Sequence, residues 1–473
     1  MQITFLGAAR QVTGSMHLLR LENGFSVLID CGMEMERGDF EPQKGEDNDQ
    51  FFPFSPSEID LVLLTHAHLD HSGNIPLLYK YGYDGQVLCT KPTAVLTEIL
   101  LFDAVSINKK KLEGLRKKYK KSSNQKTYTA DGLFLDRQVE ECLQNMVTIP
   151  FSKPFKANDF FEVTFNPAGH LLGAANLIIK VIENGTSKTI GFSGDVGRRN
   201  YPLLQDPMPM PEVDYLICET TYGGKEHKAT EEAEAILERV ITETCIEKKG
   251  RLIIPAFSIG RSQSVLYLLH KLFKEKKMYP IKIYADSPMA MKSMYAYENF
   301  HQQLNQDAQN FRKRHGSLFD FENLVYVDST KQSKQIASHH ESCIILSSSG
   351  MLTGGRINIH LEKNLGNPYC TVLVIGFAAE NTPGHALMTK QSTILLKGNL
   401  INIKAKIEVT DVLSGHADNE DLLHFVSSQK PNKLKKIFLV HGEESSMLNF
   451  QSQLQAIGYQ TEVPYKWETF ELN

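Results

Sequence analysis

Three histidines and one aspartate fall within six residues, His66-Ala67-His68-Leu69-Asp70-His71. They directly follow the apolar run IDLVLLT, which predicts a buried strand that ends at Thr65. An irregular loop at the end of a strand can direct all four side chains at one point, and imidazole nitrogens beside a carboxylate are ligands that suit zinc. The motif therefore predicts a metal site, in preference to a surface loop that merely contains many histidines.

Other polar residues also stand where predicted strands end. His170 lies in NPAGHLLGA, Asp195 in FSGDVGR and Glu219 in ICETTYGG. We expect them to gather at one edge of the fold, and the glycines beside His170 and Asp195 allow the backbone to approach a crowded centre. Taken alone, His170 or His441 would more often be structural.

The motif H-x-H-x-D-H resembles the hallmark of the metallo-β-lactamase superfamily, and Asp30, at the end of FSVLID, matches its first acidic motif. The resemblance implies two Zn²⁺ ions, with Mn²⁺ as a substitute. The first ion would be held by His66, His68 and His170, the second by Asp70, His71 and His441 (in LVHGEE), and Asp195 would bridge both. Asp30 would support the site from behind its ligands. Asp70 and Asp30 are thus counted with the catalytic residues as well.

Such a pair of ions lowers the pKa of a shared water toward neutrality and stabilises the transition state of a hydrolysis. Lactams, thioesters and phosphodiesters are all substrates within the superfamily, so the metal motif alone names none of them.

The second half of the chain resembles the β-CASP branch, whose members process nucleic acids. The segments IPAFSIGRSQSVLYLL, ADSPMAM and SSSGMLTGGRINIHL follow in that branch's order. The resemblance implies that His416, in SGHAD, protonates the leaving oxygen and that Glu219 holds it in position. The alternative is a structural histidine at a helix start, with Asp418 as the helix cap. Branch members that act on RNA carry a histidine at the position of His441, which favours single-stranded RNA as the substrate.

Positive charge is concentrated in one segment that contains Lys117 and Lys118. It fits binding to a phosphate backbone, although a solvated helix face is the ordinary alternative. Arg261, Ser349 and Arg356, in loops of the second half, are further candidates for phosphate contacts.

Hydrophobic residues make up 41% and charged residues 22% of the 473 residues, as in ordinary globular proteins. Hairpin-like strands open the chain, with a turn at Asn23-Gly24, and from Tyr222 helices alternate with strands as in a parallel sheet. We therefore predict an α/β fold, an αββα metallo-β-lactamase sandwich with an inserted β-CASP domain on a mostly parallel sheet. The predicted parts are 1–208, 209–385 for the insertion, and 386–473, where antiparallel strands are expected to resume.

One turn departs from the β-CASP pattern. The sequence Asn381-Thr382-Pro383-Gly384 stands where members of that branch have a Gly-Thr-x-Gly turn. Pro383 biases the backbone of Thr382 toward an extended conformation. Because the altered turn could reshape the substrate cleft, a hydrolase of a small phosphodiester or ester is an alternative to a ribonuclease. A non-catalytic RNA-binding subunit is a third possibility, which the complete ligand set disfavours.

Seven cysteines without any C-x-x-C pair fit a reducing compartment, and the N-terminus lacks the layout of a signal peptide. We expect a cytoplasmic protein without membrane association. The sequence leaves open whether the cut is endo- or exonucleolytic and whether two copies form a homodimer.

Overall fold

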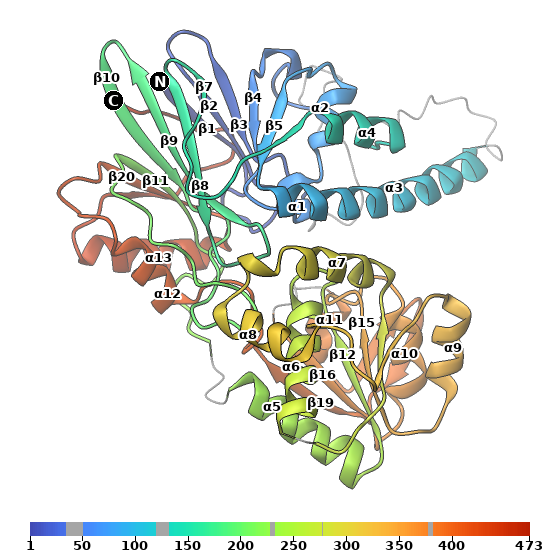
Figure 1. The fold of residues 1–473 in the computed structure, drawn as a ribbon. Coiled ribbons are helices and arrows are strands. Elements are labelled where there is room, and N and C mark those ends of the chain that lie inside the picture. The colour runs from blue at the N-terminus through green and yellow to red at the C-terminus, as the bar shows by residue number, and fades with distance from the viewer. Residues whose placement is uncertain (35–50, 120–131, 228–231, 277, 377–381) are drawn as a thin grey trace.

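Two seven-stranded sheets form the larger domain (Figure 1). The computed structural model describes residues 1–34, 51–119, 132–227, 232–276, 278–376 and 382–473. The first sheet has the order β22-β1-β2-β3-β4-β5-β6. Its strands are β1 (Gln2–Gly7), β2 (Met16–Arg20), β3 (Ser26–Ile29), β4 (Leu61–Leu63), β5 (Gln86–Cys89), β6 (Met146–Thr148) and β22 (Thr469–Glu471). β1, β2 and β3 pair antiparallel, and the predicted turn at Asn23-Gly24 connects β2 to β3, which confirms the hairpin opening.

The second sheet has the order β21-β20-β11-β10-β9-β8-β7. It consists of β7 (Phe155–Asn158), β8 (Phe161–Pro167), β9 (Ala175–Glu183), β10 (Thr186–Phe192), β11 (Tyr215–Glu219), β20 (Lys436–Val440) and β21 (Thr461–Glu462). Neighbouring strands from β7 to β10 pair antiparallel, whereas β11, β20 and β21 run parallel to β10. The parallel strands β10, β11 and β20 thus end at one common edge, where Glu219 is the last residue of β11 and Asp195 and His441 follow β10 and β20.

One apolar core lies between the two sheets, and helices cover their outer faces. Side chains such as Phe5, Phe165 and Phe438 fill the inner core. Helices α2 (Ile75–Lys80), α3 (Lys91–Tyr119) and α4 (Asp136–Gln144) pack on the first sheet, and α12 (Asn419–Val426) and α13 (Glu444–Ala456) pack on the second. This is the predicted αββα arrangement.

A six-stranded sheet with the order β14-β13-β15-β12-β16-β19 forms the inserted domain. Every pairing in it is parallel, as predicted. Its strands are β12 (Arg251–Pro255), β13 (Ile283–Asp286), β14 (Leu324–Tyr326), β15 (Cys343–Ser347), β16 (Thr371–Ile375) and β19 (Lys406–Thr410). The accompanying helices are α5 (Ala233–Ile241), α6 (Arg261–Glu275), α7 (Pro288–Asn299), α8 (Gln306–His315), α9 (Thr330–Ser338), α10 (Ile357–Asn364) and α11 (Pro383–Met388).

The expected return to antiparallel strands after residue 385 is only partly right. β17 (Thr393–Leu396) and β18 (Asn399–Asn402) form an antiparallel hairpin. β19, however, pairs in parallel with β16 and so extends the inserted sheet. The apolar pattern of a strand does not say which strand it will pair with. We propose that the inserted domain runs from α5 to β19, instead of over 209–385.

The two domains share buried side chains. One apolar cluster contains Ala67, Leu96 and Leu171 of the larger domain together with Leu252 and Leu266 of the inserted one. Helix α3 also packs against α7, as Figure 1 shows. The edge that carries the polar residues therefore faces the inserted domain across an apolar contact.

The altered turn begins a helix. Thr382 has the extended conformation expected before a proline, φ −97° and ψ 154°, and its side chain accepts a hydrogen bond from the backbone N–H of His385. Pro383 occupies the first turn of α11, where its missing N–H costs nothing. Asn381 lies outside the described residues. Within the described ranges, none of the helices combines the length and apolar character needed to cross a bilayer.

Candidate active site

Two residues separate the six-residue histidine motif from β4, which ends at Leu63 and not at Thr65 as predicted. His66 and His68 lie in the turn after the strand, while Asp70 and His71 stand on the single-turn helix α1 (Leu69–Ser72). The sequence predicts an irregular loop over the whole motif, whereas in the structure Leu69–Ser72 form the short helix α1. Asp70 and His71 belong to a different group of ligand atoms from His66 and His68, although the ring centres of His66 and His71 lie 4.1 Å apart.

The first group joins His66 and His68 with His170. The Nδ1 of His68 lies 3.1 Å from the Nε2 of His66 and 3.1 Å from the Nε2 of His170. Asp195 completes the group, because its Oδ2 lies 3.5 Å from the Nε2 of both His66 and His170.

The second group consists of Asp70, His71 and His441. The Nε2 atoms of His71 and His441 are 3.2 Å apart, and the Oδ2 of Asp70 lies 3.6 Å from the Nε2 of His441. The Oδ1 of Asp195 is 3.2 Å from the Nε2 of His71 and 3.6 Å from that of His441. Asp195 thus presents one carboxylate oxygen to each group.

This donor set fits divalent metal ions. For zinc–nitrogen bonds of about 2.0–2.1 Å in a tetrahedron, neighbouring ligand atoms lie about 3.3 Å apart. The observed separations of 3.1 to 3.5 Å in the first group match that edge. In addition, the Oδ1 of Asp195 is buried without a hydrogen-bond partner among the described residues. A buried carboxylate oxygen without a partner is costly, and a cation would satisfy it.

The protonation states of the first group and of Asp195 also suit metal binding. Burial holds the pKa of His66 and His170 well below the usual range and lowers the pKa of His68 to about 4, so these rings are neutral and offer lone pairs. Burial raises the pKa of Asp195, but the neighbouring His441 and His71 outweigh it and hold that pKa well below its usual value. The carboxylate is therefore ionised.

The second ring nitrogen of most of these histidines is held by a protein oxygen. The Nδ1 of His71 donates to Oδ2 of Asp30 at 2.7 Å, and the Nδ1 of His170 donates to the carbonyl oxygen of Gly415 at 3.0 Å. The Nδ1 of His441 lies 3.1 Å from the hydroxyl of Thr221. Such partners fix the tautomer and orientation of ligand histidines. The sequence pointed to Asp30 but not to Thr221 or Gly415, because both partners are set by long-range packing.

Backbone strain marks two of these positions. Asp30 and His441 have φ values of 58° and 51°, in the left-handed region that non-glycine residues rarely adopt. Each directly follows a strand, β3 and β20, respectively. The strained conformation turns the side chain out of the strand direction toward the ligand groups. The glycines beside His170 and Asp195, Gly169 and Gly194, also have positive φ, 73° and 54°.

His416 lies at the side of the ligand groups and is paired with Glu219. Its Nδ1 is 3.2 Å from Oε1 of Glu219 and 3.9 Å from Oδ2 of Asp195. Glu219 is buried, and its two oxygens accept hydrogen bonds from the backbone N–H groups of Val196 and Thr221. The side chain of His416 is 17% exposed. A rigid carboxylate thus holds an imidazole that solvent and a ligand can reach.

His227 was not singled out from the sequence. Its Nε2 donates to the carbonyl oxygen of His416 at 3.1 Å, and its ring packs at 4.7 Å from the ring of Tyr222. It therefore fixes the backbone that carries His416. A single histidine in a polar stretch offers no sequence signal for such a role.

The candidate phosphate contacts are not part of the ligand groups. Arg261, at the start of α6, is half-buried and donates to the carbonyl oxygen of Ile375, and the hydroxyl of Ser349 lies 3.5 Å from the carbonyl oxygen of Gly354. Arg356 donates to Oδ1 of Asp286 and to two backbone carbonyls. Lys117 is exposed near the end of α3, and the side chain of Lys118 lies outside the described residues. Their roles stay predictions.

Three protein-family models match the chain. The metallo-beta-lactamase superfamily matches residues 9–135, the Beta-Casp domain 262–387 and the Zn-dependent metallo-hydrolase RNA specificity domain 400–464. A relative from Thermus thermophilus, named as a ribonuclease, is 31% identical over 95% of this chain and 94% of its own. A relative from Methanocaldococcus jannaschii, named as a transcription termination factor, is 30% identical over 98% of this chain and 70% of its own.

A solved structure of a protein of unknown function from Enterococcus faecalis resembles the whole fold. It has a TM-score of 0.56 at 13% identity and covers 100% of this chain and 99% of its own. That likeness concerns the fold alone. More than the fold follows from the family matches, the Thermus relative and the His/Asp groups. The chain belongs to the β-CASP branch of the metallo-β-lactamase superfamily and is a metal-dependent hydrolase.

Proposed function

We propose that the protein is a zinc-dependent ribonuclease that hydrolyses phosphodiester bonds of single-stranded RNA with two metal ions. The observation that carries the proposal is the position of Asp195, whose two oxygens each face one group of ligands while His416 lies 3.9 Å away. A bridging carboxylate beside a reachable imidazole is the arrangement that a two-ion hydrolysis with a separate acid requires.

The first ion would be held by His66, His68, His170 and Asp195, and the second by Asp70, His71, His441 and Asp195. Nitrogen-rich groups with one or two carboxylates favour zinc, and Mn²⁺ is the expected substitute. Two bound ions would lower the pKa of a water toward neutrality and offset the charge that develops on the phosphate. Asp30, Thr221 and Gly415 keep the ligand rings in place.

His416 would donate a proton to the leaving ribose oxygen. Its Nδ1 faces Glu219, so the other ring nitrogen is the one available to the substrate. Glu219 orients the ring and is itself fixed by two backbone N–H groups. A positioned acid of this kind contributes about 10²–10⁴-fold to the rate.

RNA is the proposed substrate for two reasons. The family model of the RNA specificity domain covers residues 400–464, which include both His416 and His441. The relatives from Thermus and Methanocaldococcus are named for ribonuclease activity and for transcription termination. The seven cysteines are free and buried, which suits a reducing compartment, and we place the protein in the cytoplasm.

An end-labelled RNA time course with metal-replete protein, compared with its His416→Ala variant, tests the proposal. We expect shortening of the RNA by the native protein, and the product lengths reveal endo- or exonucleolytic action and its direction. Protein that holds two zinc ions by elemental analysis but leaves RNA intact in every metal condition contradicts the proposal. Cleavage of a nitrophenyl phosphodiester by that same protein would then favour a small-molecule hydrolase, and RNA binding without any hydrolysis would favour a binding subunit.

A further inference from the structure

A short segment near the C-terminus crosses between the two sheets at the edge that carries the ligands. β21 pairs in parallel with β20, and His441 directly follows β20, so the residues after β21 emerge at the same edge. β22 pairs antiparallel with β1, with Thr469 opposite Thr4, so the residues before β22 lie at the carboxyl end of β1. The connecting segment 463–468 therefore runs along the edge on which the second ligand group stands.

The loop after β1 connects this segment to the ligands. The carbonyl oxygen of Ala8 accepts a hydrogen bond of 2.7 Å from the backbone N–H of His441, and the N–H of Ser15 donates to the carbonyl oxygen of Asp70 at 2.8 Å. Arg10 lies between these two anchors, and its Nη2 donates to the carbonyl oxygen of Val463 at 3.0 Å. Only one residue, Ala9, separates Ala8 from Arg10, a backbone span of at most about 7 Å.

Two aromatic rings on this segment face solvent. Tyr465 is 60% and Trp467 46% exposed, although large aromatic side chains usually bury most of their surface. The guanidinium carbon of Arg10 lies 3.7 Å from the centre of the Tyr465 ring, and the Nζ of Lys466 lies 5.2 Å from the centre of the Trp467 ring. Each ring therefore has a cation over one of its faces.

The cations are themselves held in place. Arg10 forms an ion pair with Glu444, and Lys466 forms one with Glu34. The backbone is also fixed, because the N–H of Trp467 donates to the carbonyl oxygen of Phe5 at 2.7 Å and the N–H of Tyr465 donates to Oε2 of Glu468 at 2.8 Å. Since both cations are neutralised by acids, this surface is not suited to attract phosphates by net charge. Its remaining binding capacity is that of flat, rigid, exposed rings.

We propose that Tyr465 and Trp467 form a stacking platform that binds bases of the single-stranded RNA next to the catalytic edge, on the side of His441. Every base offers a flat face, so such a platform holds the strand without reading its sequence. This inference rests on the proposed ribonuclease function and adds to it a base-binding site outside the inserted domain.

Trp467 gives the experiment a direct signal because it is the only tryptophan in the chain. Zinc-loaded His416→Ala protein, in which turnover is slow, is titrated with a short unstructured oligoadenylate while tryptophan fluorescence is recorded. We expect strong quenching, and weaker quenching with a matched oligonucleotide that contains abasic positions. The abasic strand keeps its phosphates, so the comparison isolates stacking from charge.

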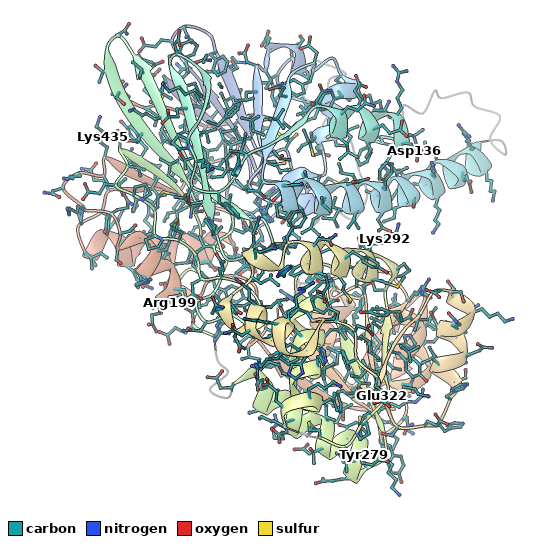
Figure 2. All side chains as sticks on the ribbon, viewed as in Figure 1. Asp136, Arg199, Tyr279, Lys292, Glu322 and Lys435 are labelled. Carbon is teal, nitrogen blue, oxygen red and sulfur yellow. The ribbon has the colours of Figure 1, made fainter. Side chains whose placement is uncertain are left out.

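Kinetics of the otherwise native enzyme provide the second readout. We expect Tyr465→Ala and Trp467→Ala each to raise KM for RNA about tenfold to a hundredfold with little change in kcat, the range that one stacked base supplies. Trp467→Phe should keep most of the affinity. Tyr279→Ala is the matched control, because Tyr279 is 70% exposed at the far end of the inserted domain (Figure 2). Activity on a nitrophenyl phosphodiester, which is too small to reach the rings, should be equal in all variants and reports correct folding.

The outcomes separate the two proposals. If native enzyme leaves RNA intact, the ribonuclease function is overturned and the platform with it. If RNA is cleaved but KM is unchanged in both alanine variants and fluorescence is not quenched, the platform alone is overturned.

Discussion

Asp30 and His71 are joined by a hydrogen bond of 2.7 Å from Nδ1 to Oδ2, and both side chains are only 2% exposed. The other oxygen of Asp30 accepts the backbone N–H of Thr65 at 2.8 Å. One carboxylate therefore connects a ligand of the second group to the strand end that precedes the first group.

Replacing Asp30 with alanine should weaken binding of the second ion. His71 would lose the acceptor that fixes its tautomer, and the loss of such a partner typically costs about 10–100-fold in metal affinity. Competition with a chromogenic chelator measures the affinity of each ion. Asp60→Ala removes an exposed carboxylate that, within the described part of the chain, accepts a hydrogen bond only from the N–H of Ser26, and it should leave both affinities unchanged. Unaltered binding of both ions by Asp30→Ala would contradict the role given to this residue.

His416→Ala should slow RNA cleavage about 10²–10⁴-fold while both ions stay bound, because the histidine serves the leaving oxygen and not a metal. A nitrophenyl phosphodiester should be far less affected, since nitrophenolate leaves without a proton. The measurements are kcat on both substrates and the zinc content of the purified variant. His424→Ala, which changes an exposed histidine on the neighbouring helix α12, is the control. An equal loss on both substrates would exclude a general acid.

Asp195→Ala should remove both ions, whereas His68→Ala should reduce binding of the first ion only. The reason is that Asp195 presents one oxygen to each ligand group, while His68 contacts only one of them. Elemental analysis after dialysis gives the number of zinc ions per chain. Asp159→Ala, an exposed aspartate in the turn between β7 and β8, should keep the full content. Retention of one tightly bound ion by Asp195→Ala would show that the carboxylate does not bridge.

Gly260→Ala should destabilise the protein more than Gly316→Ala. Both glycines have positive φ, 85° and 87°, a sparsely populated backbone conformation that costs an alanine about 1–3 kcal/mol. Only at Gly260 would the new Cβ meet a neighbour, the Cδ1 of Leu171 at 3.1 Å, while Gly316 is in open space. Crowding of a packed contact adds about 1 kcal/mol or more. Denaturant titration gives the free energies of unfolding of the two variants. Equal values would show that the Leu171 side chain moves aside without a measurable energetic cost.

Local motifs predicted the groups that the structure brings together. His66, His68, Asp70 and His71 are close in sequence, and His170, Asp195 and His441 each follow a strand, so the ends of neighbouring strands place them at one edge. That reasoning needs only strand order. It could not supply Thr221 or Gly415, because a hydroxyl or a carbonyl oxygen at a given position has no sequence signature and depends on long-range packing.

The partners of strands were harder to predict than the strands themselves. The pattern in INIKAKIEVT indicated strands correctly, but β19 pairs with β16 in the inserted sheet and not with the enclosing one. Likewise, the last strand, β22, returns to β1 across the whole chain length. Alternating apolar residues mark a strand and its buried face, whereas the choice of neighbour is made by the topology that the intervening segments allow.

The buried cluster that contains Leu171 and Leu252 has a consequence for how this protein can be divided. A chain from which the segment α5 to β19 has been excised would expose Ala67, Leu96 and Leu171 to water, beside the very residues that hold the metals. Excision would thus yield an aggregating remnant instead of a smaller working enzyme. The insertion is therefore not a detachable module, because each part covers apolar surface of the other.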